Sequence, residues 1–181
     1  MLAVAKATTI AFAMDPLLRP NQAKFQGKAM RIRVLGYFGV IGAVPVAWWL
    51  RGHRDPYPVG TDLMLSVPIL LDAGGNAMGV YERANIDDAV HFANAAILMT
   101  AFGRAISPRT RTPLEAAALT VGFGAAGEAA WEIMEFLAQK AGFRGMNLTY
   151  EDTMADTLES FLGSLVAAAI TFRRWREVRP R

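Results

Sequence analysis

The sequence contains no cysteine, so disulfide bonds, thiolate nucleophiles and cysteine-ligated metal sites are excluded. Histidine is nearly absent as well, because His53 and His91 are the only two in the chain. Charged residues make up 19% of the sequence, whereas soluble proteins carry about 25%. There is also no internal repeat and no low-complexity segment. These absences exclude thiol chemistry and leave carboxylates as the main chemically active groups.

Apolar residues dominate what is present. They account for 53% of the 181 residues, and the mean hydropathy is +0.23. The charged residues are clustered, and the Arg and Lys residues gather beside apolar segments, as juxtamembrane anchors do. The net charge is +3, but no basic stripe interleaved with aromatics is present, so a nucleic-acid partner is not predicted. The composition predicts one domain in contact with membrane lipids.

The apolar segments predict an all-α, polytopic membrane helix bundle with about five transmembrane helices. The predicted spans are residues 34–50, 63–81, 89–102, 114–137 and 152–172. Residues 1–18 are interrupted by Lys6 and predict an amphipathic or interfacial helix; a sixth span and a cleaved signal peptide are the alternatives. The predicted organisation is an N-terminal basic segment (1–33), the bundle (34–173) and a basic tail (174–181).

Two predicted spans have unusual backbones. Residues 63–81 contain Pro68 and three glycines beside Asp72, so a broken helix is expected, with its polar groups satisfied by protein or a wet cavity. The fourth span carries Gly122, Gly124 and Gly127, which are small enough for a neighbouring helix to approach closely.

Acidic residues and one histidine lie inside the predicted spans. Ionisable groups are costly in hydrocarbon, so they usually face a bundle interior and mark a functional site. Three sets occur at intervals of three or four residues, which places each set on one helix face. The sets are Asp88/His91, Glu128/Glu132/Glu135 and Asp152/Asp156/Glu159. With five spans, all three sets lie at the same membrane face, and we expect them to form one pocket.

Roles within this pocket follow from the chemistry of each side chain. The residues expected to be catalytic are His91, Glu128, Glu132 and Asp156. Those expected to contact substrate are Asp72, Asn76 and Trp131. The hypothetical metal ligands are Asp88, His91, Glu128, Glu132, Glu135, Asp152 and Asp156. Asp87 is interpreted as a solvated loop charge. The positive-inside rule favours a cytoplasmic tail and an outward-facing pocket.

Several kinds of chemistry are compatible with these residues. One imidazole with several carboxylates is a ligand set suited to a divalent Zn, Mn or Fe ion. A di-iron bundle is disfavoured, because such sites use two Glu-x-x-His pairs and this chain has one Asp-x-x-His. Crowded carboxylates could also act as metal-free general acids with His91 as the base. Two further alternatives remain open. The residues could bind or transport a cation, a proton or a small amphiphile, or they could form purely structural hydrogen bonds.

The chain resembles a known group of membrane proteins at these residues. The segments are Asp88-Ala-Val-His91-Phe92, Gly127-Glu128-Ala-Ala-Trp131-Glu132-Ile-Met-Glu135-Phe136 and Asp152-Thr-Met-Ala-Asp156, followed by Gly163. They are similar to the signature of the YjdF-like integral membrane proteins and to a variant of the VanZ-like superfamily pattern. The resemblance covers residues 60–170. It departs from the VanZ pattern after the central Glu, where Trp131-Glu132 and Glu135 stand in place of the expected Gln and Arg.

The resemblance implies a multi-pass protein of the bacterial inner membrane without an established activity. VanZ itself is linked to glycopeptide resistance, which is not carried over to this chain because of the departure above. The leading hypothesis is an intramembrane carboxylate and histidine pocket, metal-dependent, that acts on a lipid or lipid-linked envelope substrate. The alternatives are a non-enzymatic transporter or binding protein and a structural subunit of a membrane complex. Membrane lipids are the expected partners, together with a second copy of the chain or a membrane-complex subunit.

Overall fold

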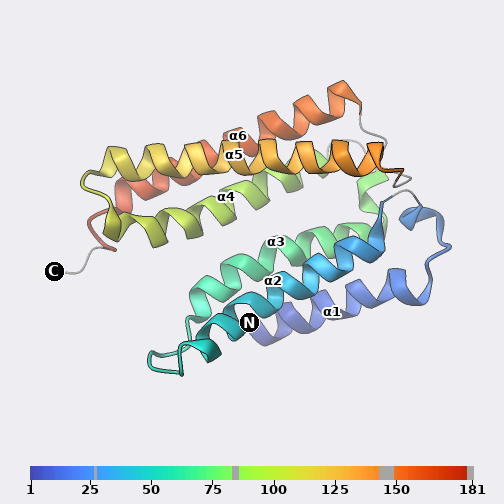
Figure 1. Ribbon diagram of the computed structural model, residues 1–181, viewed down its shortest axis with the longest axis horizontal. Helices are drawn as coiled ribbons and strands as arrows, with labels where there is room; N and C mark the ends of the chain where they lie inside the picture. Colours follow the sequence, from blue (N-terminus) through green and yellow to red (C-terminus); the bar gives the residue numbers. More distant parts are fainter. Residues whose placement is uncertain (27, 83–85, 143–148, 179–181) are drawn as a thin grey trace. The chain divides into compact units, whose positions relative to one another are not determined.

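The computed structural model describes residues 1–26, 28–82, 86–142 and 149–178 (Figure 1). Most of these residues are in helices, and no strand occurs among them. The described residues divide into two compact units: unit 1 runs up to residue 82, and unit 2 begins at residue 86. Each unit is described by itself.

Unit 1 is a bundle of helices closed by a small apolar core. Its elements are α1 (Leu2–Leu18), η1 (Ala23–Phe25), α2 (Met30–Leu50), α3 (Val59–Met78) and η2 (Val80–Glu82). In this unit α1 packs against both α2 and α3. The buried core consists of Ala13, Phe25, Met30, Val34, Tyr37 and Ala73. The N-terminal segment is thus a packed helix of this bundle.

The helix α3 is continuous, so the break expected between Pro68 and Gly79 is absent. Two of its glycines are needed for close packing. A Cβ on Gly74 would lie 3.1 Å from the Phe12 ring, and a Cβ on Gly75 would overlap the Tyr81 ring. The helix stops at Gly79, which has φ +64°, a left-handed conformation that glycine adopts without steric cost. The glycines therefore accommodate aromatic side chains and end the helix, and they do not interrupt it.

Unit 2 contains α4 (Ile86–Ile106), η3 (Ser107–Arg109), α5 (Pro113–Lys140) and α6 (Tyr150–Arg174) (Figure 1). Here α6 packs along both α4 and α5. Two of the helices have sequence-encoded starts, because Thr112 accepts a hydrogen bond from the Glu115 backbone N–H and Thr149 accepts one from that of Asp152. At the other end, the Trp175 indole N–H donates to Thr110 Oγ1 at 2.8 Å and ties α6 to η3.

A seam of small residues lets α6 lie close to its neighbours. The buried residues of this seam are Ser160, Gly163, Ser164, Ala167, Ala168 and Thr171. A Cβ on Gly163 would lie 2.4 Å from the backbone oxygen of Phe92 in α4, so only glycine fits. Of the small residues expected to allow close approach in α5, Gly124 does so, facing Ser164. Gly122 and Gly127 have open space beside them within 4 Å.

Three helices of the described part of the chain are long and apolar enough to cross a membrane: Met30–Leu50, Ile86–Arg109 and Tyr150–Arg174. The other two predicted spans correspond to α3 and α5, which have 20 and 28 residues but fall outside this set. The helix α5 carries four glutamates along its length. The prediction of an all-α helical membrane bundle is therefore confirmed. By length and composition, three of its described helices could cross a membrane.

Candidate metal centre in unit 2

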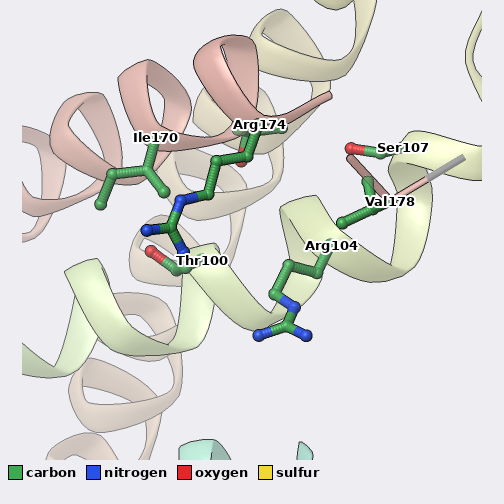
Figure 2. Close-up of a pocket in the computed structure, with 7 residues that line it drawn as sticks. Thr100, Arg104, Ser107, Ile170, Arg174 and Val178 are labelled. Carbon is green, nitrogen blue, oxygen red and sulfur yellow. The ribbon is translucent and has the colours of Figure 1, made fainter. Parts of the chain in front are cut away.

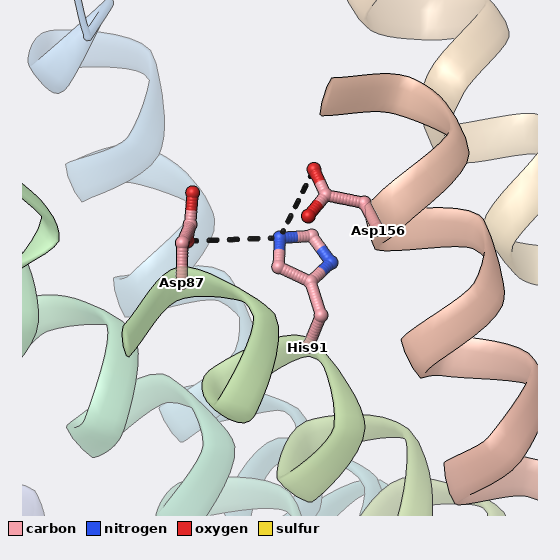
Figure 3. A group of neighbouring side chains, drawn as sticks. All are labelled: Asp87, His91 and Asp156. Atoms are coloured by element: carbon pink, nitrogen blue, oxygen red, sulfur yellow. Dashed lines mark ion pairs between the residues drawn. The ribbon is translucent and has the colours of Figure 1, made fainter. Parts of the chain in front are cut away.

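His91 lies in the second turn of α4, between two aspartates (Figure 3). Asp87 is one turn earlier on the same helix, and Asp156 projects from the second turn of α6. The Nε2 atom of His91 is 3.6 Å from Asp156 Oδ2 and 3.9 Å from Asp87 Oδ1. One potential ligand atom from each of the three residues lies within 4.8 Å of the other two. Figure 3 shows both carboxylates directed at the same imidazole nitrogen.

The local packing explains why these residues meet. Thr149 caps the start of α6 and so sets where Asp156 lies in the second turn. Gly163, two turns further along α6, rests on the backbone of Phe92, the residue after His91. The contact between Gly163 and Phe92 therefore sets the distance between α4 and α6 close to His91. A larger residue at the glycine position would move Asp156 away from the imidazole.

Glu128 of α5 approaches His91 from the other side of the ring. Its Oε1 atom is 3.9 Å from His91 Nδ1, whereas the two aspartates face Nε2. This oxygen is buried and has no hydrogen-bond partner in the described part of the chain, and both carboxylate oxygens of Glu132 are buried as well. Glu132 interacts electrostatically with Glu128 and His91. The α5 acids therefore form the wall of the site opposite the aspartates.

The site is buried on one side and open on the other. The side chain of Asp156 is 10% exposed and that of Glu128 12%, whereas His91 is 24% and Asp87 49% exposed. A molecule can therefore reach the imidazole from the Asp87 side.

The spacing of the three side chains resembles that of metal ligands. His91 Nε2 lies 3.6 Å from Asp156 Oδ2 and 3.9 Å from Asp87 Oδ1, and both separations exceed hydrogen-bond lengths. Two ligands of one zinc ion at about 2.1 Å in tetrahedral geometry lie about 3.4 Å apart, so the group has nearly the spacing of a metal site.

The other predicted residues of unit 2 lie outside the group of three. Asp88 is next to Asp87 on α4 but is not one of the three clustered residues. Glu135 is buried in α5 with 7% exposure. Asp152 is exposed in the first turn of α6, yet it interacts electrostatically with Asp156. Trp131 of α5 is 39% exposed. The three helices thus bring acids to one end of unit 2, with His91 at the centre.

Asp72 and Asn76, expected to contact substrate, lie in unit 1 and have partners there. The carboxylate of Asp72 accepts hydrogen bonds from Tyr37 at 2.5 Å and from Tyr81 at 3.1 Å. Asn76 donates to the same carboxylate at 3.2 Å, and Arg33 Nη1 lies 3.5 Å from it. This arrangement joins α2, α3 and η2, which is a structural role for Asp72.

Two features were missed from the sequence. Asp87 was interpreted as a loop charge, although its spacing of four residues from His91 is a signal for a shared helix face.

A second missed feature is the ion pair between Lys6 Nζ and Asp62 Oδ2 at 2.5 Å, with Asp62 fully buried. The Tyr57 hydroxyl also donates to Asp62. Burial and this hydrogen bond raise the pKa of Tyr57 to about 12, so it remains a donor at neutral pH.

The fold and the site define the class of protein, an all-α membrane protein with a histidine and acid group between two helices of spanning length. The chain belongs to a family of membrane proteins, because residues 25–177 match the family described as "Predicted membrane protein (DUF2238)". No curated protein and no solved structure matches the chain. The family establishes a membrane protein and names no activity, so a function has to be argued from the geometry of the site.

Proposed function

We propose that Asp87, His91 and Asp156 bind a divalent metal ion and that the protein is a metal-dependent enzyme of the membrane. One observation carries the proposal: three potential ligand atoms from two helices lie within 4.8 Å of one another. One imidazole nitrogen and two carboxylate oxygens suit Zn, Mn or Fe at a borderline-to-hard site. In this proposal Asp87 is the aspartate ligand from α4, the role for which the sequence analysis named Asp88.

The α5 acids have distinct roles in this proposal. Glu128 lies beside Nδ1 of His91 and orients the imidazole so that Nε2 points toward the aspartates, a common arrangement around metal-binding histidines. Glu132 has both carboxylate oxygens buried and interacts electrostatically with Glu128 and His91, which suits a general acid or base of the same site. A bound metal would supply Lewis acidity toward a substrate oxygen.

The substrate class follows from the surroundings. The site lies near the start of α4 and α6, both apolar enough to span a membrane, so a molecule held in the bilayer can reach it. We propose a lipid or lipid-linked envelope substrate and a location in the bacterial inner membrane. The quoted motifs, with Trp131-Glu132 after the central Glu128, favour the YjdF-like form over the VanZ-like one. No antibiotic-related role is proposed.

Elemental analysis of the purified protein tests the metal site. The wild type is expected to retain about one divalent ion per chain, and His91→Ala and Asp87→Asn are expected to lose it, because each removes one of only three ligands. Asp88→Asn is the matched control, since it makes the same change one residue away and should keep the metal. A wild type without stoichiometric metal would remove the proposal. Equal losses in Asp87→Asn and Asp88→Asn would contradict the assigned ligand.

Cation or proton transport is the second candidate. The buried carboxylate oxygens of Glu128 and Glu132 favour it, because buried acids are costly in a membrane unless a cation or proton binds them. Flux into vesicles containing the purified protein should then fall strongly in Glu128→Gln. Unchanged flux in that variant would count against transport.

A structural role in a membrane assembly is the third candidate. Gly122 and Gly127 of α5 have no neighbour within 4 Å of an added Cβ, and small residues favour close helix contacts in membranes. The partner would be a second copy of the chain or an unrelated subunit. Co-purification of a subunit at a fixed ratio, lost in Gly122→Leu, would support this role.

A further inference from the structure

A second site lies at the end of unit 2 opposite to His91. The last turns of α4 and α6 border a small open pocket with a volume of about 40 Å³ (Figure 2). Its polar lining consists of Thr100, Arg104, Ser107, Thr171 and Arg174. Figure 2 shows the guanidinium group of Arg174 beside the Thr100 hydroxyl and Arg104 on the neighbouring turn of α4. No carboxylate is among the described residues that line the pocket.

The hydrogen bonds of the lining residues determine which ligand the pocket can take. The hydroxyls of Thr100 and Ser107 donate to backbone carbonyls of their own helix, at 2.7 and 2.6 Å. The hydroxyl of Thr171 is buried against α4, because a Cβ added to Gly103 would lie 2.0 Å from its Oγ1. The donors that a ligand can reach are therefore the two exposed guanidinium groups. Such a donor set selects an anion.

The position of the pocket narrows the class of anion. Both helices that form it are long and apolar enough to span a membrane, and the pocket lies where both of them end. Four further arginines surround this end of the unit and strengthen the attraction for anionic lipid. They are Arg109, Arg111, Arg173 and Arg176.

We propose that Arg104 and Arg174 bind the phosphate group of an anionic phospholipid. A guanidinium group can donate two parallel hydrogen bonds to phosphate oxygens, which gives geometric selectivity as well as affinity. The phosphate sits between the ends of α4 and α6, and the acyl chains continue along the apolar surface of α6, past Ile170. This site takes a resident lipid and is independent of the metal proposal, because it uses none of the same residues.

Titration of delipidated protein with phosphatidylglycerol in detergent micelles tests the site, with bound lipid counted by native mass spectrometry. Arg104→Ala/Arg174→Ala is expected to weaken binding at least about tenfold, because each arginine makes charge-assisted hydrogen bonds. Arg173→Ala/Arg176→Ala is the matched control. It removes the same charge from the same end of the unit, outside the pocket, and should change binding by less than about threefold.

A conservative variant and a second ligand complete the experiment. Arg174→Lys conserves the charge and should weaken binding several-fold even if the double variant fails to fold, because lysine lacks the fork of donors that arginine presents to a phosphate. Inorganic phosphate is titrated in parallel; binding as tight as that of phosphatidylglycerol would overturn the lipid assignment. Equal losses in the two double-arginine variants, or no phosphatidylglycerol bound by the wild type, would overturn the site itself.

Discussion

Replacing Lys6 with methionine is expected to destabilise unit 1 by about 3–5 kcal/mol, the cost of leaving a buried charge without its partner. Asp62 has 0% exposure, and Lys6 Nζ lies 2.5 Å from its carboxylate. The same ammonium group donates to the backbone oxygen of Ile41 at 2.7 Å, so it joins α1 to α2 as well as to α3. Methionine fills similar space but supplies no charge and no donor.

The loss of stability is measured as the shift in the denaturant or thermal unfolding of the purified protein in detergent. The double variant Lys6→Met/Asp62→Leu should recover most of the lost stability, because a well-packed apolar pair can replace a buried ion pair without net cost. Lys140→Met is the control, since this lysine is exposed at the end of α5 and its loss should have an effect within about 0.5 kcal/mol. A Lys6→Met protein as stable as this control would show that the pair is unimportant.

The sequence predicts the helices of this protein well because their ends are chemically marked. The segment predicted over 34–50 corresponds to α2 (Met30–Leu50), and the one predicted over 152–172 corresponds to α6 (Tyr150–Arg174). Apolar runs bounded by charges, proline or a capping threonine identify such segments without any knowledge of their neighbours. The gathering of acids from α4, α5 and α6 was also predictable, because the number of intervening helices places those helix ends on one side.

Pairing between side chains could not be predicted in the same way. Asp87 and Asp88 stand four and three residues before His91, and both intervals place an acid beside it on a helix. The choice depends on how α4 is rotated against α6, which packing determines. Lys6 and Asp62 are distant in the sequence, and no local pattern relates them. Their pairing becomes visible only once α1 is packed against α3.

Replacing Gly163 with alanine is expected to destabilise unit 2 by about 1–3 kcal/mol, the usual cost of overpacking. The added Cβ would lie 2.4 Å from the backbone oxygen of Phe92 and 3.0 Å from Ala95 Cβ. A backbone carbonyl within a helix cannot turn aside as a flexible side chain can. The two helices must therefore separate or rotate at this point.

This separation should reach the candidate metal centre, because Phe92 follows His91 and Gly163 lies two turns after Asp156. We expect Gly163→Ala to lose metal as well as stability, both measured on the same purified sample. Gly122→Ala is the matched control: its Cβ would meet nothing within 4 Å, and alanine favours a helix over glycine by roughly 0.5–1 kcal/mol. A Gly163→Ala protein that unfolds more easily but keeps its metal would indicate that Asp156 and His91 are held together by contacts other than this one.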